Sequence, residues 1–245
     1  MLNVMEETYI TKIIVLNRWI HREHDSKILA FSPELGKIDL VVRGAQKNTS
    51  KLSAHIEPMN LGKVMIVRGR NCDYLGGIDN ERNFRNIKTD FDKIRFSSQA
   101  LKTVEKYTFR SDTNDSYEIF SLLAEFLNFL NDFNKSINDY LLFYAFFKLK
   151  FLAIIGFLPE MYKCTKCGRK IIPGMNYFSF ASGGVVCINC DNVGSKKLTI
   201  SDSCVKVIRF SLYNDFVDIQ KLNMAEEQKK ELIRIVQLLY QYNFK

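Results

Sequence analysis

Residues 164–190 read CTKCGRKIIPGMNYFSFASGGVVCINC, and this stretch holds four of the six cysteines of the chain. They form two Cys-x-x-Cys pairs, Cys164 with Cys167 and Cys187 with Cys190, separated by 19 residues. The two residues inside each pair form a turn tight enough to place both sulfurs on one ion. We therefore expect these four thiols to bind one structural Zn²⁺, because four protein ligands leave no open position for catalysis.

Disulfide bonds are the alternative for these cysteines. The first nine residues include two glutamates and lack the basic and apolar regions of a secretory leader. We therefore expect a reducing cytoplasm, in which metal binding is favoured over disulfides. Of the two remaining cysteines, Cys204 has apolar neighbours and is expected in the core, whereas Cys72 receives no role.

The longest apolar run extends from Leu141 to Leu158 and is interrupted by Lys148 and Lys150. Two charges near the middle favour a buried helix over a membrane span. The sequence thus indicates a soluble protein without a membrane partner. With 245 residues and 47% hydrophobic content, it can form two or three folding units.

Positive charge is unevenly distributed along the chain. The 35 Lys and Arg exceed the 27 Asp and Glu, which gives a net charge of +8. Residues 81–110 carry eight basic against four acidic side chains, and residues 161–200 carry six against one. This balance indicates a polyanionic partner, most simply nucleic acid.

The first 80 residues show the pattern of β-strands. Apolar runs rich in β-branched and aromatic residues alternate with turn residues. The expected strands are residues 8–20, 28–31, 38–42, 61–67 and 74–78. Five short strands, with the longest connection between the third and the fourth, are typical of an OB-type β-barrel. An SH3-like barrel is the alternative.

The connection at residues 43–60 (RGAQKNTSKLSAHIEPMN) is polar and flexible in composition. Small barrels bind single strands by combining basic side chains with exposed aromatic rings. The candidate DNA-binding residues are the cations of this loop and of the end of the next strand: Arg43, Lys47, Lys51, Arg68 and Arg70. The local candidates for base stacking are Trp19, Phe31 and Tyr74, although aromatic residues of a small barrel are more often in its core.

After residue 90 the apolar spacing becomes helical. The first expected helix begins at Asp90 or Ser97 and ends near Tyr107, and the second begins at Asp115 or Ser116. Three further helices are expected at residues 136–156, 200–213 and 224–242. The predicted fold class is therefore α+β multidomain. A five-stranded barrel (1–82) precedes an all-α helical domain (83–161 and 193–245), into which the four-cysteine zinc module (162–192) is inserted.

Two further groups have plain structural explanations. Asp90 and Asp92 are better explained by a helix N-terminus than by a catalytic metal. His21 and His24 are expected in a solvated turn, since no other ligand completes a metal set there. The sequence also has no Gly-rich phosphate loop, no His-Glu-x-x-His motif and no nucleophile with a recognisable partner. We therefore expect no enzymatic activity.

Several motifs, taken in order, make the chain resemble a known family. The most specific are Gly156-Phe157-Leu158-Pro159, Cys164-Thr165-Lys166-Cys167-Gly168, Phe178-Ser179 and Gly183-Gly184-Val185-Val186-Cys187. Weaker agreement is found at His24-Asp25-Ser26, Gly36-Lys37, Arg43-Gly44-Ala45-Gln46-Lys47, Ser50-Lys51 and Pro58. Over nearly its whole length the chain is similar to the RecO family of bacterial recombination mediators.

The resemblance implies a cytoplasmic, nucleoid-associated protein of DNA repair and recombination after DNA damage. Such a protein binds single- and double-stranded DNA, anneals complementary strands and, with RecR, helps load RecA onto DNA coated by single-strand-binding protein. It also implies that the acidic C-terminal tail of single-strand-binding protein docks on the helical domain. Candidate hosts for that tail are Lys148, Lys150, Lys206 and Arg209. A zinc-ribbon scaffold or adaptor that binds protein or RNA is the alternative.

Overall fold

The computed structural model describes residues 7–108, 115–190 and 197–244. The chain divides into two compact units, residues 1–133 and 134–245. The domain boundaries expected from the sequence form a finer division and stay a prediction. The expected boundary between residues 192 and 193 lies outside the described residues. Residues 1–6, part of the N-terminal segment in which no secretory leader is expected, also lie outside them.

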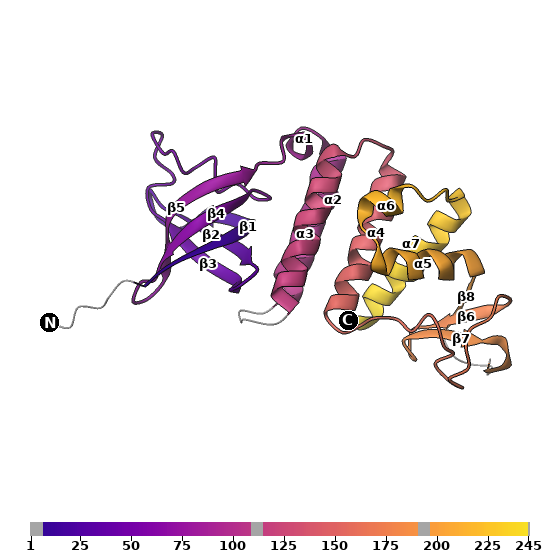
Figure 1. The fold of residues 1–245 in the computed structure, drawn as a ribbon. Coiled ribbons are helices and arrows are strands. Elements are labelled where there is room, and N and C mark those ends of the chain that lie inside the picture. The colour runs from indigo at the N-terminus through magenta and orange to yellow at the C-terminus, as the bar shows by residue number, and fades with distance from the viewer. Residues whose placement is uncertain (1–6, 109–114, 191–196, 245) are drawn as a thin grey trace. The chain divides into compact units, whose positions relative to one another are not determined.

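The first unit contains a five-stranded sheet followed, among its described residues, by three helices (Figure 1). In chain order its elements are β1 (Thr8–Ile20), β2 (Ser26–Ser32), β3 (Gly36–Val42), β4 (Leu61–Val67), β5 (Asp73–Arg82), α1 (Arg85–Lys88), α2 (Phe91–Tyr107) and α3 (Asp115–Asp132). The five predicted strands are confirmed. The first and fourth have the predicted bounds, and the other three are longer than expected.

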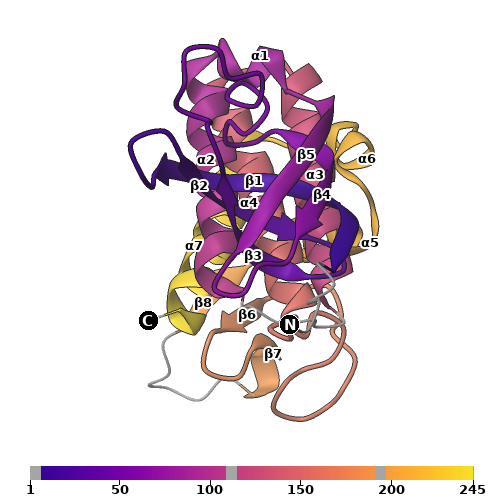
Figure 2. The same ribbon diagram turned by 90° about the vertical axis from the view of Figure 1, so that its left-hand side faces the viewer.

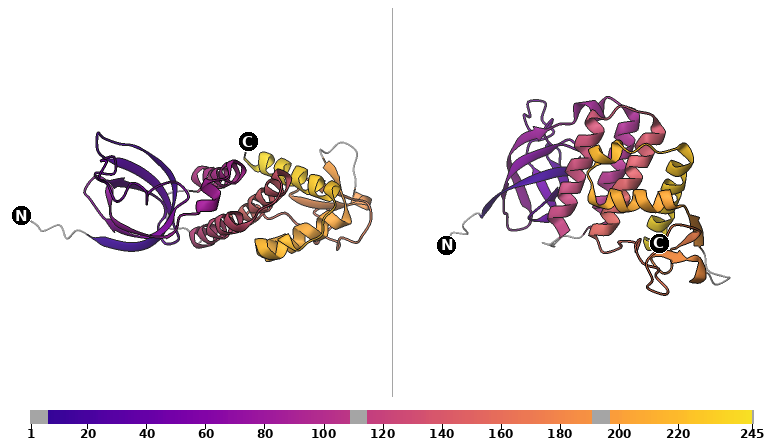
Figure 3. Two further views of the ribbon diagram at one scale, coloured as in Figure 1. Left: turned by 90° about the horizontal axis from the view of Figure 1, so that it is seen from above. Right: turned by 45° about the vertical axis from the view of Figure 1, so that its right-hand side comes forward.

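The five strands form one closed barrel in the order β1-β2-β3-β5-β4. Strand β1 is antiparallel to both β2 and β4, whereas β3 and β5 pair in parallel through Leu40 with Asp73 and Val41 with Tyr74. The left view of Figure 3 shows the strands curving into a ring, and in Figure 2 β5 crosses β1. The closure places the ends of strands distant in sequence next to one another.

The core of the barrel includes residues from the long connection between β3 and β4. Ala45 and Ile56 are buried in the same apolar cluster as the inward side chains of the strands. The connection folds into successive turns, in which the Ser50 N–H donates to the Lys47 carbonyl at 2.9 Å. The segment expected to be polar and flexible is therefore anchored in the barrel by its own apolar residues.

Helix α2 begins at the first of its two predicted caps. The Asp90 carboxylate accepts hydrogen bonds from the backbone N–H groups of Asp92 and Lys93, at 2.9 and 3.0 Å. Ser97, the other candidate, is buried within the helix. The capping bonds satisfy two of the N–H groups that a helix start leaves without intrahelical partners.

The second unit is helical and contains a small three-stranded sheet in the order β7-β6-β8. Its elements are α4 (Ile137–Ile154), β6 (Asn176–Ser179), β7 (Gly184–Cys187), the 3₁₀ turn η1 (Ile188–Cys190), β8 (Lys197–Ile200), α5 (Asp202–Tyr213), α6 (Phe216–Gln220) and α7 (Glu226–Asn243). Figures 1 and 3 show α4 and α7 side by side. None of the described helices combines the length and apolar character needed to cross a membrane.

The three helices expected in the second unit are present with shifted starts. Residue 200 is wrong as a helix start, because Ile200 ends β8, and Ser201 caps α5 by accepting from the Cys204 N–H at 3.2 Å. Helix α7 begins at Glu226 instead of near 224. Cys204 is buried, which confirms its predicted place in the core.

Replacing Asp90 with alanine should destabilise the first unit by about 1 kcal/mol, because α2 loses both capping hydrogen bonds. Urea unfolding measures this change. Asp92→Ala is the matched control, since Asp92 lies in the same first turn but accepts no capping bond. Equal destabilisation by the two substitutions would contradict the capping role.

Candidate metal centre and nucleic-acid interface

The four predicted cysteines come together in space. Their Sγ atoms all lie within 4.8 Å of one another, and those of Cys167 and Cys187 are 3.9 Å apart. A tetrahedral site with metal–sulfur bonds of about 2.3 Å needs sulfurs roughly 3.8 Å apart. All four residues are free thiols, and none of them forms the disulfide bond that was the alternative to metal binding. The cluster can hold a metal ion.

Local backbone geometry explains how the two pairs meet. The Gly168 N–H donates to the Cys164 carbonyl at 2.8 Å, and this turn requires the positive φ of +71° that glycine adopts without strain. The second pair begins with Cys187, the last residue of β7 in the β6–β7 hairpin. There the Cys187 N–H donates to the Cys164 Sγ at 3.4 Å, which links the two halves of the cluster.

A basic side chain favours the ionised form of one thiol. The Arg169 Nε–H donates to the Cys167 Sγ at 3.4 Å and lowers the pKa of Cys167 to about 6. Metals bind the thiolate, so this contact prepares the residue for coordination. Sequence reasoning missed Arg169, whose only signal was a cation next to the Cys-x-x-Cys-Gly turn.

The cysteine module is attached closely to the segment that follows α4. Glu160 and Gly183 are joined by a hydrogen bond of 2.9 Å, and the Val185 N–H donates to the Glu160 carbonyl at the same distance. A Cβ on Gly184 would lie 2.3 Å from the Glu160 carbonyl oxygen, so this approach requires glycine. The glycines before Cys187 thus fix β7 against the incoming chain.

The five predicted DNA-binding cations are exposed, and all but Lys51 belong to two segments that meet. The five residues are Arg43, Lys47, Lys51, Arg68 and Arg70. Val41 and Val67 both pair with Tyr74 at the start of β5. The ends of β3 and β4, which lead into Arg43 and Arg68, therefore lie on either side of Tyr74. We call the region formed by residues 43–47 and 68–74 the basic edge.

Two arginines of the basic edge stack on tyrosine rings. The Arg43 Cζ lies 4.2 Å from the centre of the Tyr74 ring, and the Arg68 Cζ lies 4.8 Å from that of Tyr9. Arg68 is also 3.9 Å from Glu7, whereas Arg43 makes no ion pair within the described residues. Stacking holds a guanidinium in place while its edge can still donate hydrogen bonds.

The other three predicted cations differ in their surroundings. Lys47 lies in the turn that begins at Gly44, and the Gly44 N–H donates to the Asp25 carboxylate at 2.9 Å. Arg70 follows Arg68 by two residues and shares its end of the sheet. Lys51 lies further along the loop, and no described contact joins it to the basic edge.

The aromatic candidates divide between surface and core. Phe31 is only 1% exposed, so it is not available for base stacking and is buried, as expected for most aromatic residues of a small barrel. Trp19 is 39% exposed, with the Lys27 ammonium 5.8 Å from its ring. Tyr74 is half-buried beneath Arg43. Tyr9, which supports Arg68, was not among the three stacking candidates, because the pairing of β1 with β4 that places it beside Arg68 could not be foreseen.

Lys148 of α4 is half-buried between two rings in the second unit. Its ammonium lies 4.8 Å from the ring of Tyr144 and 5.4 Å from that of Tyr240 on α7. Within the described residues it has no carboxylate partner. Burial lowers the pKa of Lys148 to about 8.

The other candidate hosts for an acidic tail have different surroundings. The ammonium of Lys150 lies 5.6 Å from the ring of Phe216. Arg209 donates from Nε to the Met161 carbonyl at 3.0 Å, which uses part of its guanidinium inside the protein. Lys206 on α5 is exposed. Of these three, Lys206 is the cation most accessible to a partner.

Two models of one protein family together match most of the chain. A model described as "Recombination protein O N terminal" matches residues 5–82, and one described as "Recombination protein O C terminal" matches residues 88–244. A "DNA repair protein RecO" from Dehalococcoides mccartyi is 32% identical over 91% of this chain and 85% of its own length. Proteins of the same name from Thermoanaerobacter and Bacillus pumilus are each 26% identical, over 92% and 93% of this chain and 88% and 86% of their own lengths.

Cys164→Ser should abolish stoichiometric metal binding and unfold the cysteine module, since a structural metal of this kind contributes on the order of 10 kcal/mol. Metal analysis and thermal unfolding with and without a chelator measure both effects. Cys72→Ser is the matched control, because Cys72 lies outside the cluster. A Cys164→Ser protein with unchanged metal content and chelator response would refute the metal assignment.

Lys148→Met should stabilise the protein at pH 7 by on the order of 1–3 kcal/mol. The folded-state pKa of about 8 lies below the value near 10.4 of an unfolded chain. Below pH 8 both states are protonated, so the folded state carries the full cost of the buried charge. The cost disappears as the pH rises towards 10.

Urea unfolding at pH 7 and pH 10 tests this dependence. The advantage of Lys148→Met over the wild-type protein should shrink between the two values, whereas that of the exposed control Lys206→Met should not change. An advantage of Lys148→Met that is constant with pH would show that the Lys148 ammonium is not penalised by burial.

Proposed function

The chain belongs to the RecO family of DNA repair proteins, and from that premise we propose that it is a non-enzymatic recombination mediator. It anneals complementary single strands and, with RecR, helps load RecA onto DNA coated by single-strand-binding protein. The observation that carries the proposal is the match of both family models to this chain. It is supported by the exposed arginines at the edge of the N-terminal sheet, which stack on tyrosine rings. The absence of catalytic motifs from the sequence supports a binding role.

We infer that the N-terminal barrel is of the OB type and that DNA lies across the basic edge. Barrels of this type track a strand with cations and hold its bases against aromatic rings. Arg43 and Arg68 are the best-supported phosphate ligands, since Tyr74 and Tyr9 orient their guanidinium groups. Lys47 and Arg70 extend the same surface, and Lys51 contacts a more distant phosphate. Trp19 provides the exposed ring.

Annealing follows from charge neutralisation. Two complementary strands repel each other through their phosphates, and bound cations lower this repulsion so that pairing is limited by encounter. Each phosphate contact also releases counterions, which makes binding strongly dependent on salt. Both single- and double-stranded DNA present such phosphates, so both are proposed ligands.

The metal is proposed to be one Zn²⁺ with a structural role. Four thiolates are the ligand set of closed zinc sites, and soft sulfur ligands select zinc over magnesium or calcium. The ion would hold Cys164, Cys167, Cys187 and Cys190 together and so brace the module against the chain that follows α4. DNA binding by the barrel does not require it.

A site for the acidic, apolar tail of single-strand-binding protein is proposed on α5. Lys206, Phe210 and Tyr213 are exposed and recur at a spacing that places them on one face of the helix. One cation beside two aromatic rings suits a peptide with both carboxylates and apolar side chains. The protein is proposed to act in the bacterial cytoplasm at the nucleoid, with the domain boundaries expected from the sequence.

Annealing of complementary oligonucleotides, with single-strand-binding protein present, should be accelerated by the wild-type protein and should weaken steeply with salt. For binding to single strands, Arg43→Gln and Arg68→Gln should each reduce the log-log salt slope by about 0.7, because each removes one phosphate contact. Titrations across a salt series measure the slope.

Lys12→Gln is the control for these substitutions. Lys12 is an exposed cation of the same sheet, away from the basic edge, and it pairs with Glu81 at 2.8 Å. Its loss should leave the slope unchanged. Tight binding without annealing would favour the adaptor alternative, and a flat slope for the wild-type protein would contradict the electrostatic mechanism.

A further inference from the structure

The face of α2 that points to solvent carries a row of cations that starts at an aromatic ring. Its members are exposed and lie on one side of the helix: Phe91, Arg95, Lys102 and Lys106. With 3.6 residues per turn, these four positions fall within a sector of about 60°. We call them the α2 stripe. Its three cations belong to the basic excess of residues 81–110, to which the proposed function assigns no role.

The positive charge of the α2 stripe is not neutralised. Within the part of the chain that the structure describes, its three cations form no ion pair. The acidic side chains of the same helix, Asp92 and Glu105, are half-buried and pair with no cation there either. The stripe therefore offers three free positive charges to an anionic partner.

Helix α2 is fixed to the barrel and to α3, so the stripe stands on a rigid support. At the end of the helix, the Lys37 ammonium of β3 donates to the carbonyls of Glu105 and Thr108, at 2.6 Å each. On its inner face, the ammonium of the buried Lys93 donates to the Asn131 carbonyl of α3 at 3.1 Å. A partner then has to order only the exposed side chains, which keeps the entropic cost of binding low.

The cations and the ring together fit a single strand of nucleic acid. From Phe91 to Lys106 the stripe extends about 22 Å along the helix, so its cations can contact several phosphates of one backbone. The Phe91 ring is 81% exposed. Proteins that bind single strands place such rings for base stacking beside cations that follow the backbone. The bases of a duplex already stack on one another, so the ring favours an unpaired strand.

Other anionic partners fit the stripe less well. The centre of a protein interface is apolar and depleted of charge, whereas the stripe has one apolar side chain beside three cations. A membrane surface would take up the apolar face of an amphipathic helix. Helix α2 buries that face against β1 and α3.

Building on the proposed function, we propose that the α2 stripe binds single-stranded DNA as a second contact surface of the first unit. Phe91 stacks on a base, and the three cations contact phosphates. The stripe is separate from the basic edge. Lys37, which holds the end of α2, lies six residues before Arg43, a distance of about 20 Å along an extended strand. The first unit therefore contacts DNA at two places.

Fluorescence anisotropy across a salt series, with a labelled 30-nucleotide oligo-dT that can reach both surfaces, tests the cations. Arg95→Gln combined with Lys102→Gln should reduce the log-log salt slope by about 1.4, because two phosphate contacts of about 0.7 each are lost. The matched control combines Lys230→Gln with Arg234→Gln, which removes two exposed cations of α7 and should leave the slope unchanged. Thermal unfolding verifies that both variants are folded.

Tryptophan fluorescence tests the ring. Trp19 is the only tryptophan of the chain, so Trp19→Phe combined with Phe91→Trp places a single reporter on the stripe. Oligo-dT should quench its emission by stacking, and oligo-dT already paired with oligo-dA should quench it much less. Tyr213→Trp in the same Trp19→Phe background is the control, since Tyr213 is a 72% exposed ring of α5 and its emission should not respond.

Three results would overturn this inference and leave the proposed function intact, because the basic edge would still account for binding. These are an unchanged slope for the α2 double variant, an equal loss of slope in both double variants, and emission at position 91 that oligo-dT leaves unchanged or that the duplex quenches equally. Failure of the wild-type protein to bind oligo-dT would overturn both.

Discussion

Strand β1 keeps the N-terminal sheet closed, because its first half pairs with β4 and its second half with β2. The register of the β1–β2 pairing shifts between Val15 and Asn17, close to where β1 passes from pairing with β4 to pairing with β2. Closure brings the ends of β3 and β4 to the two sides of Tyr74, and so it assembles the basic edge from segments 25 residues apart. Without it, Arg43 and Arg68 would lie on separate, open strands.

The cysteine module obeys a different constraint. Its 27 residues from Cys164 to Cys190 bury few apolar side chains, chiefly Ile171, Phe178, Val185 and Val186. So small a core cannot by itself offset the entropy of ordering the segment. Four thiols within 4.8 Å of one another would supply the missing constraint by holding one metal ion between them. Strand pairing holds the barrel, whereas a metal ion would hold the module, so removal of the metal is expected to affect the module and to leave the barrel folded.

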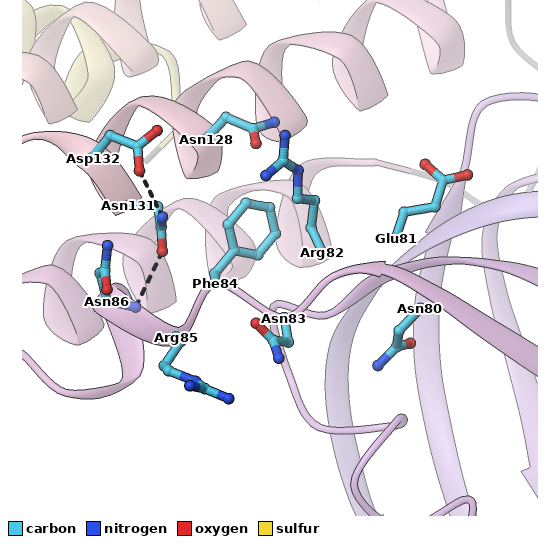
Figure 4. A pocket seen from close by; sticks show the side chains of 10 residues that line it. All are labelled: Asn80, Glu81, Arg82, Asn83, Phe84, Arg85, Asn86, Asn128, Asn131 and Asp132. Carbon is cyan, nitrogen blue, oxygen red and sulfur yellow. Dashed lines mark hydrogen bonds between the residues drawn. The ribbon is translucent and has the colours of Figure 1, made fainter.

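The sequence predicted the features that depend on local patterns. The strand at residues 8–20, the Asp90 cap and the four-cysteine cluster follow from alternation, capping chemistry and spacing. Features set by tertiary contacts were missed. Phe31 is buried on the outer face of β2, opposite Ile28 and Ala30, where α3 packs against the strand. Helix α1 is too short to show a helical period. A pocket at the end of β5 joins residues 80–86 to residues 128–132 (Figure 4), a proximity that no pattern along the chain indicates.

The central claim is that DNA lies on the basic edge of the barrel. Hydrogen exchange of backbone amides, measured at low salt with and without oligo-dT, tests it most directly. The account predicts slower exchange on DNA binding at residues 43–51 and 68–74, with little change in the cysteine module at residues 162–190. Protection confined to the second unit, with the edge unchanged, would contradict it.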